Sequence, residues 1–150
     1  MGWVEDLHGQ TVGVDTSPFI YLIEEHPGYL GAVRSFFSAV DSSQIQAVTS
    51  TVTLLEVMVQ PFRRDADELA HRYRAALLNA TGLSCQEVSS GVAEEAAKLR
   101  ATYNIRTPDA IQLATAILAG ASSSLTNDSF LPSMPAIQIL ILDRLVHLPQ

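Results

Sequence analysis

The sequence contains very little cysteine, and Cys85 is the single one among its 150 residues. One cysteine cannot close an intrachain disulfide or supply a cysteine-based zinc site, and it suits a reducing compartment. The N-terminus also lacks a basic stretch followed by an apolar run, and no unbroken apolar segment approaches the roughly 20 residues that span a bilayer. These absences predict a soluble cytoplasmic protein without a membrane segment.

Basic residues are also scarce. Nine Lys and Arg stand against sixteen Asp and Glu, which gives a formal net charge of -7. A field of that sign repels polyanions, so a protein that coats nucleic acid is excluded. A nucleic-acid enzyme is still compatible with this charge, because bound divalent cations reverse the sign of an acidic pocket. That interpretation makes a metal ion obligatory.

The length and the hydrophobic content of 47% predict one compact domain over residues 1–150. Short β-branched or apolar runs alternate with longer helical patterns. The expected strands are residues 11–14, 45–49, 83–88, 123–126 and 136–142, and the expected helices include 29–40, 51–60, 65–80, 90–103 and 107–119. Pro61 is expected to stop the helix that begins at Thr51. This alternation predicts a parallel sheet covered by helices on both faces.

Four acidic residues lie at the edges of apolar segments: Asp15, Glu56, Asp109 and Asp128. Asp15 and Asp128 directly follow expected strands, and Glu56 and Asp109 lie in helices that begin at the same edge of the sheet. Ligands of such sheets bind beyond the carboxyl ends of the strands. Burying several unpaired carboxylates is costly unless they share a cation. The sequence therefore predicts one shared cation site.

Each acid also has a plain structural explanation when it is considered by itself. Asp15 and Asp128 could be turn or cap residues, and Asp109 could interact with the dipole of its own helix. Glu56 could be a solvated helix position, but its neighbours Leu54, Leu55, Val57, Met58 and Val59 predict that it is at least half buried.

Taken together, four segments resemble the PIN domains, and in particular the small VapC-type ribonuclease toxins. They are Val12-Gly-Val-Asp15-Thr-Ser, the segment from Ser50 to Glu56, Arg106-Thr-Pro-Asp109-Ala and Thr126-Asn-Asp128-Ser-Phe. Their order and approximate spacing agree with the family over nearly the whole chain. The resemblance implies a three-layer α/β/α sandwich with a mainly parallel central sheet. Pro18 departs from the family, which often carries a polar or small residue there.

The resemblance implies a metal-dependent endoribonuclease that holds Mg²⁺ or Mn²⁺ through oxygen ligands. By analogy, Asp15 and Asp109 are expected to ligate the metal directly, and Glu56 and Asp128 to ligate it directly or through water. Thr126, and with less support Thr16 or Ser17, is expected to hydrogen-bond these carboxylates. The implied partners are an RNA substrate, a small antitoxin protein that blocks the acidic pocket, and a second copy in a homodimer.

Other functions share part of this evidence. A housekeeping PIN-type ribonuclease in RNA processing would use the same residues, and a non-catalytic PIN-like scaffold would use only the edge of the pocket. A flavodoxin-like binding module lacks support because the sequence has no Gly-rich phosphate loop. A basic group could contact phosphate, although a solvated helix face explains it better. It consists of Arg63, Arg64, His71, Arg72 and Arg74.

Overall fold

The computed structural model describes residues 2–147. Five strands form one sheet in which every pairing is parallel, in the order β3-β2-β1-β4-β5. The strands are β1 (Thr11–Val14), β2 (Gln46–Ser50), β3 (Leu83–Gln86), β4 (Ser123–Thr126) and β5 (Gln138–Ile141). The chain adds β2 and β3 on one side of β1, and then adds β4 and β5 on the other side. The strand order thus reverses between β1 and β4.

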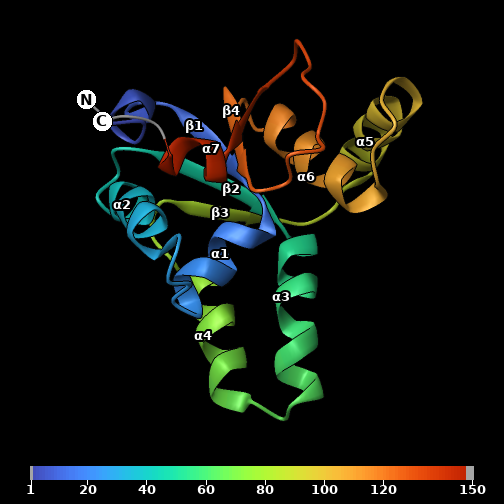
Figure 1. The fold of residues 1–150 in the computed structure, drawn as a ribbon. Helices are drawn as coiled ribbons and strands as arrows, with labels where there is room; N and C mark the ends of the chain where they lie inside the picture. The colour runs from blue at the N-terminus through green and yellow to red at the C-terminus, as the bar shows by residue number, and fades with distance from the viewer. Residues whose placement is uncertain (1, 148–150) are drawn as a thin grey trace.

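Helices cover both faces of the sheet (Figure 1). They are α1 (Thr16–Ile23), α2 (Leu30–Asp41), α3 (Thr51–Arg63), α4 (Asp67–Leu78), α5 (Ser90–Thr102), α6 (Thr107–Leu118) and α7 (Leu142–Val146), with a 3-10 turn at Glu5–Leu7. The predicted three-layer α/β/α sandwich is confirmed. None of the helices within residues 2–147 is long and apolar enough to cross a membrane.

Two apolar clusters on opposite faces of the sheet hold these layers together. Val12 and Val14 of β1 pack with residues of α1 to α4, among them Phe19, Phe36 and Tyr73. On the other face, residues of α5 and α6 pack with Val48 of β2. The side chains of consecutive strand residues point to opposite faces, so neighbouring residues Ala47 and Val48 of β2 pack into different clusters.

Gly13, between the two valines of β1, allows α6 to pack closely against the sheet. A Cβ atom at this position would lie 2.5 Å from the Cβ of Ala116. The close approach of β1 and α6 depends on the absence of a side chain at Gly13.

The structure extends one of the expected elements and shortens another. Helix α3 continues through Pro61 to Arg63, because the ring of Pro61 is buried and α3 packs along α4. The proline removes one N–H from the last turn, where the loss of a helical bond is tolerated. The expected strand 136–142 is shorter, and Leu142 begins α7, which has only five residues and too short a pattern to recognise.

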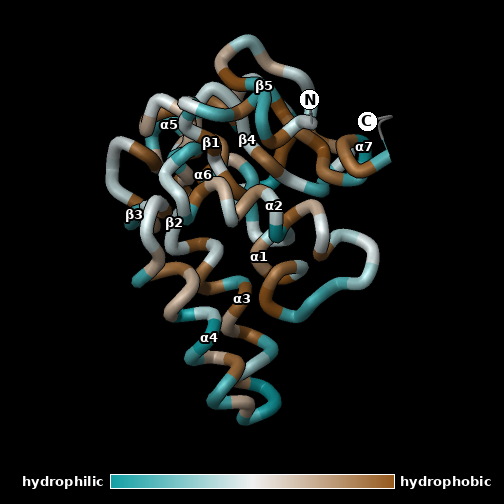
Figure 2. The backbone as a smooth tube through the Cα atoms, turned by 90° about the vertical axis from the view of Figure 1, so that its left-hand side faces the viewer, coloured by the Kyte–Doolittle hydropathy of each residue, from teal (hydrophilic) through white to brown (hydrophobic). Residues whose placement is uncertain are grey.

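The hairpin of α3 and α4 extends away from the sheet (Figure 1). Hydrophilic residues gather at its tip (Figure 2). The N-terminal end of α3 follows β2 directly, so this end of the hairpin lies beside the carboxyl edge of the sheet.

Candidate active site

The carboxyl ends of β1 and β4 form the floor of the site. These two strands are paired, and the backbone N–H of Asp15 donates to the carbonyl of Leu125 at 2.9 Å. Asp15 follows β1 and Asp128 follows β4, at the point where the strand order reverses. Such switch points are the usual ligand sites of open parallel sheets.

Asp15 is the N-cap of α1, so the alternative prediction that it is a cap residue is correct. Its Oδ1 accepts from the backbone N–H of Thr16 at 2.8 Å, and its Oδ2 accepts from Oγ1 of Thr126 at 2.8 Å. Burial raises the pKa of Asp15 above its usual range, the two hydrogen bonds oppose this shift, and the charges of Asp109 and Glu56 add to it. A cap residue alone would not need two further carboxylates nearby.

Asp109 lies in the first turn of α6 and is buried, with 8% of its surface exposed. Its partner is Arg106, the N-cap residue of the same helix, whose Nε donates to Oδ2 at 3.0 Å and whose Nη2 donates to Oδ1 at 3.5 Å. Arg100 of α5 fixes the loop before α6 by donating to the carbonyl of Ile105 and to Oγ1 of Thr107, both at 3.0 Å. Asp109 is thus held at the pocket with an internal cation beside it.

Glu56 is exposed, and the prediction that it is at least half buried is wrong. The prediction assumed that all the apolar neighbours of Glu56 are buried. Val57 and Met58 are buried, but Leu55 and Val59 are themselves exposed. The side chain is nevertheless held in place, because Oγ1 of Thr16 donates to Oε1 of Glu56 at 2.5 Å. Helix α3 therefore presents Glu56 to the start of α1.

A buried polar network beneath the site was not predicted. Gln112 of α6 accepts from Oγ of Ser50 at 2.8 Å and donates to Oγ1 of Thr53 at 2.5 Å. Thr53 also lies 3.3 Å from the hydroxyl of Thr16. These contacts connect α6, α3 and α1, which carry or flank three of the four acids. The sequence indicates this network only weakly, mainly through the presence of Gln112 within a largely apolar helix.

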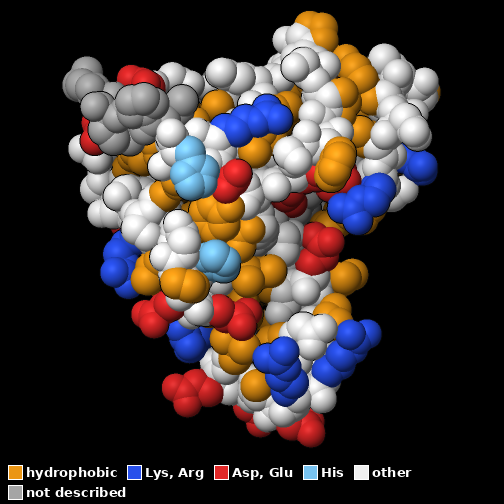
Figure 3. Space-filling view, viewed as in Figure 1, with side chains coloured by type: hydrophobic (Ala, Val, Ile, Leu, Met, Phe, Trp, Pro, Cys, Tyr) orange, Lys and Arg blue, Asp and Glu red, His pale blue; other side chains and the backbone are white. Residues whose placement is uncertain are grey.

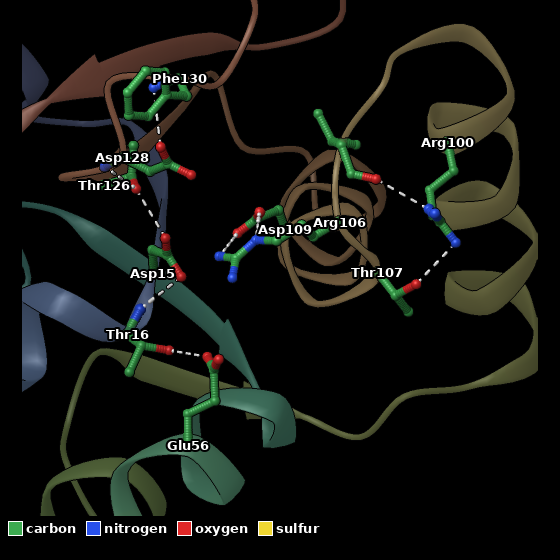
Figure 4. A network of polar contacts seen from close by, with 11 residues as sticks. Asp15, Thr16, Glu56, Arg100, Arg106, Thr107, Asp109, Thr126, Asp128 and Phe130 are labelled. Carbon is green, nitrogen blue, oxygen red and sulfur yellow. Dashed lines mark hydrogen bonds and ion pairs between the residues drawn. The ribbon is translucent and has the colours of Figure 1, made fainter.

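All four acids line one pocket, which we call the acidic pocket. It has a volume of about 290 Å³ and is lined by Asp15, Thr16, Ser17, Ile20, Tyr21, Glu56, Arg106, Asp109, Asn127 and Asp128. In the space-filling view, acidic side chains gather with a basic one in the hollow between the body of the protein and the top of α3 (Figure 3). Figure 4 shows the Arg106 guanidinium pointing from α6 toward Asp15. Convergence on one edge was predicted, but the role of Arg106 was not.

The four carboxylates share this pocket without forming a ready ligand cage. In the part of the chain that the structure describes, no three Asp, Glu, His or Cys side chains are grouped so as to hold one ion. Each of the four carboxylates already has a partner within the protein, and the partner of Asp109 is the cationic Arg106. Direct ligation by Asp15, Glu56, Asp109 and Asp128 stays a prediction.

Thr126 makes the contact expected of it. Its hydroxyl donates to Asp15 and accepts from the backbone N–H of Asp128 at 3.1 Å, so it connects two of the acids. Asn127 was not predicted as a site residue. Its amide donates to the hydroxyl of Tyr21 at 3.1 Å and its carbonyl accepts from the N–H of Asp143 at 2.8 Å, which attaches α7 to this edge.

The basic group lies mainly along the α3–α4 hairpin, away from the sheet. Arg63 ends α3, and His71, Arg72 and Arg74 belong to α4. Arg72 donates to the carbonyl of Ile23 at 2.6 Å, and Arg74 lies 3.4 Å from His71. Arg63 follows Glu56 by two helical turns, about 10 Å along α3. Phosphate contact by these residues stays a prediction.

Comparison with known proteins identifies the family. The sequence matches the PIN domain family over residues 12–136. The chain belongs to the PIN domain family. This match includes strands β2, β3 and β4, nearly all of β1, and every residue that lines the acidic pocket. No curated protein is similar enough in sequence to match this PIN domain.

Solved structures share the fold of this PIN domain. A toxin-antitoxin complex from Klebsiella pneumoniae is 25% identical, with a TM-score of 0.66 over 88% of this chain and 97% of that chain. VapBC2 from Rickettsia felis, bound to a DNA fragment from its promoter, is 15% identical, with a TM-score of 0.66 over 87% and 98%. VapC20 of Mycobacterium tuberculosis, a sarcin-ricin loop cleaving toxin, is 19% identical, with a TM-score of 0.60 over 76% and 86%.

Proposed function

We propose that this PIN domain is a divalent-metal-dependent endoribonuclease and the toxin of a type II toxin-antitoxin pair. The observation that carries the proposal is the acidic pocket itself, where carboxylates from four separate segments meet at the reversal of strand order. A stable fold does not need this convergence, because mutually repelling charges around a half-buried Asp15 reduce stability. Functional sites commonly retain such strain.

The residues of the acidic pocket suit Mg²⁺ or Mn²⁺ in their chemistry. Every candidate ligand offers oxygen, which these hard ions prefer. Arg106 shows that the pocket already attracts a positive charge. When bound, the metal would lower the pKa of a water molecule and stabilise the departing oxygen of the RNA phosphodiester.

The chain's own residues would position and neutralise the reacting groups. We assign Asp15 and Asp109 as direct metal ligands, with Glu56 and Asp128 ligating directly or through water. Thr126 holds Oδ2 of Asp15, so the orientation of this carboxylate does not depend on the metal. The proposed reaction uses no covalent protein nucleophile.

The toxin assignment draws on the structural neighbours. Two of them are toxin-antitoxin complexes and a third is an RNA-cleaving toxin. We therefore expect a small antitoxin that covers the acidic pocket, a homodimer, and action on RNA in the cytoplasm. A partner that replaces the metal's charge with Arg or Lys would suit the four carboxylates best.

Incubation of the purified protein with total RNA tests the proposal. Mg²⁺ or Mn²⁺ should produce discrete new RNA ends, and EDTA should abolish them. Asp109→Asn should lose cleavage while its melting temperature is retained or raised, because one repelling charge is gone. Asp143→Asn, an acid outside the acidic pocket, is the matched control and should cleave normally. Metal-independent cleavage, or full activity in Asp109→Asn, would reject the proposed site.

A further inference from the structure

Phe130 lies two residues beyond Asp128 and leaves 94% of its surface in solvent, more than any other large apolar side chain within residues 2–147. A single exposed apolar residue is common and needs no explanation by itself. Phe130 differs in its position, because it stands at the rim of the acidic pocket rather than on a remote loop (Figure 4).

The backbone at Phe130 is tied to the candidate catalytic acid. The N–H of Phe130 donates to Oδ1 of Asp128 at 2.9 Å, and the N–H of Leu131 lies 3.4 Å from the carbonyl of Asp128. Asp128 is tied in turn to Thr126. These hydrogen bonds hold the backbone of Phe130 in a fixed place relative to Asp128.

A second cavity, which we call the flanking cavity, adjoins the acidic pocket at this rim. Its volume is about 420 Å³, and it shares Arg106, Asp109 and Asp128 with the acidic pocket. The other residues that line it are the aromatic Phe130, the apolar Ile105 and Leu131, and the polar Asn104. The combination of a flat ring, apolar walls and one amide fits a nucleobase.

Arg106 lies at the boundary between the two cavities. Its side chain is 75% exposed although two of its N–H groups contact Asp109. A guanidinium carries five donors and pairs well with phosphate oxygens. When an RNA strand enters the acidic pocket, its next nucleotide would thus contact the cation of Arg106 and the aromatic ring of Phe130.

We propose that the flanking cavity binds one unpaired nucleotide of single-stranded RNA, with its base stacked on Phe130 and its phosphate facing Arg106. This inference rests on the proposed nuclease function and adds a substrate subsite to it. Stacking suits a protein of net charge -7, because it does not depend on electrostatic attraction. A protein partner is less suited to Phe130, since its neighbour Ser129 is polar and exposed.

Binding and cleavage of single-stranded RNA, measured separately, test this subsite. Affinity is measured by fluorescence anisotropy with a labelled mixed-sequence oligonucleotide in Ca²⁺, and cleavage is measured in Mn²⁺. Phe130→Ala should weaken binding by about 5- to 150-fold, the range for loss of one base-stacking ring. Phe130→Trp should keep wild-type affinity. Phe62→Ala removes another exposed ring, at the end of α3, and should change nothing.

A matched change in the RNA shows whether the ring stacks on a base. An abasic nucleotide is placed at each position of the RNA in turn. At one RNA position it should weaken binding to the wild-type protein. At the same RNA position it should leave the affinity of Phe130→Ala unchanged. Equal loss in both proteins, or unchanged affinity of Phe130→Ala, would overturn the subsite. An effect of Phe130→Ala on binding of a protein partner alone would also overturn it.

The outcomes separate the subsite from the proposed nuclease function. RNA cleavage that is insensitive to Phe130→Ala rejects the subsite and leaves the nuclease in place. Base-dependent binding to Phe130 without any metal-dependent cleavage retains the subsite and rejects the nuclease. A wild-type protein that neither binds nor cleaves RNA rejects both.

Discussion

Gly13 offers a quantitative test of how β1 and α6 bring Asp15 and Asp109 together. Gly13→Ala would place a Cβ 2.5 Å from the Cβ of Ala116, far inside van der Waals contact. Both positions are buried, so the strand and the helix must move apart. Overpacking of this kind costs about 1–3 kcal/mol. We expect the free energy of unfolding to fall by that amount, and Mn²⁺ affinity to fall as well, because Asp15 directly follows β1 and Asp109 lies in α6.

The matching variant at Ala116 isolates this contact. Ala116→Gly alone should cost about 1 kcal/mol through helix propensity. In the double variant Gly13→Ala/Ala116→Gly, the clashing Cβ of Ala116 is absent. The double variant should therefore lose less free energy of unfolding than the sum of the two single variants, by about 1 kcal/mol or more. Gly31→Ala, where nothing lies within 4 Å of the added Cβ, should be neutral or stabilising and controls for loss of glycine in general.

Urea denaturation followed by far-UV circular dichroism, at neutral pH without metal, gives these free energies. Additive losses in the double variant would refute the claim that Gly13 and Ala116 fix the spacing between β1 and α6. A neutral Gly13→Ala would refute it equally.

Three further outcomes concern the acidic pocket. The pKa of Asp15 is raised in the folded protein, so its contribution to the free energy of unfolding is present below its unfolded pKa and is lost as pH rises through its folded pKa. Urea titrations should therefore show Asp15→Asn to be more stable than wild type at pH 7. This difference in the free energy of unfolding should vanish near pH 3, where the wild-type carboxyl is protonated. Arg106→Gln should raise Mn²⁺ affinity by up to about fivefold in calorimetry, since an ion pair whose Arg106 partner is largely exposed contributes about 0.2–1 kcal/mol that metal binding must replace. Arg34→Gln, which removes an ion pair with Glu25, should leave the Mn²⁺ affinity unchanged. Thr126→Val should weaken Mn²⁺ binding about 10- to 100-fold, the usual effect of removing a residue that orients a ligand, and an unchanged affinity would show that Thr126 only shapes the turn.

The strands and the edge that carries the acids could be predicted because their signals are local. Short β-branched or apolar runs mark the strands, and acids at the ends of parallel strands must meet at one edge. The ligand roles assigned to those acids came from family resemblance and stay predictions.

Features that depend on tertiary packing could not be predicted. The burial of Glu56 was misjudged because a helix at the edge of the sheet exposes two of its apolar residues, Leu55 and Val59. Pro61 was expected to end α3, yet packing against α4 sustains the last turn. The contact of Arg106 with Asp109 depends on side-chain conformation at the start of α6, for which the sequence carries no periodic signal.

Anomalous diffraction from crystals soaked in Mn²⁺ tests the central claim most directly. A bound ion between the strand ends gives a peak whose position identifies its ligands. We predict a peak in the acidic pocket with Asp15 and Asp109 among its oxygen ligands and the Arg106 guanidinium moved away from Asp109. Crystals at saturating Mn²⁺ with no peak in the acidic pocket, and with Arg106 still paired to Asp109, would contradict the account.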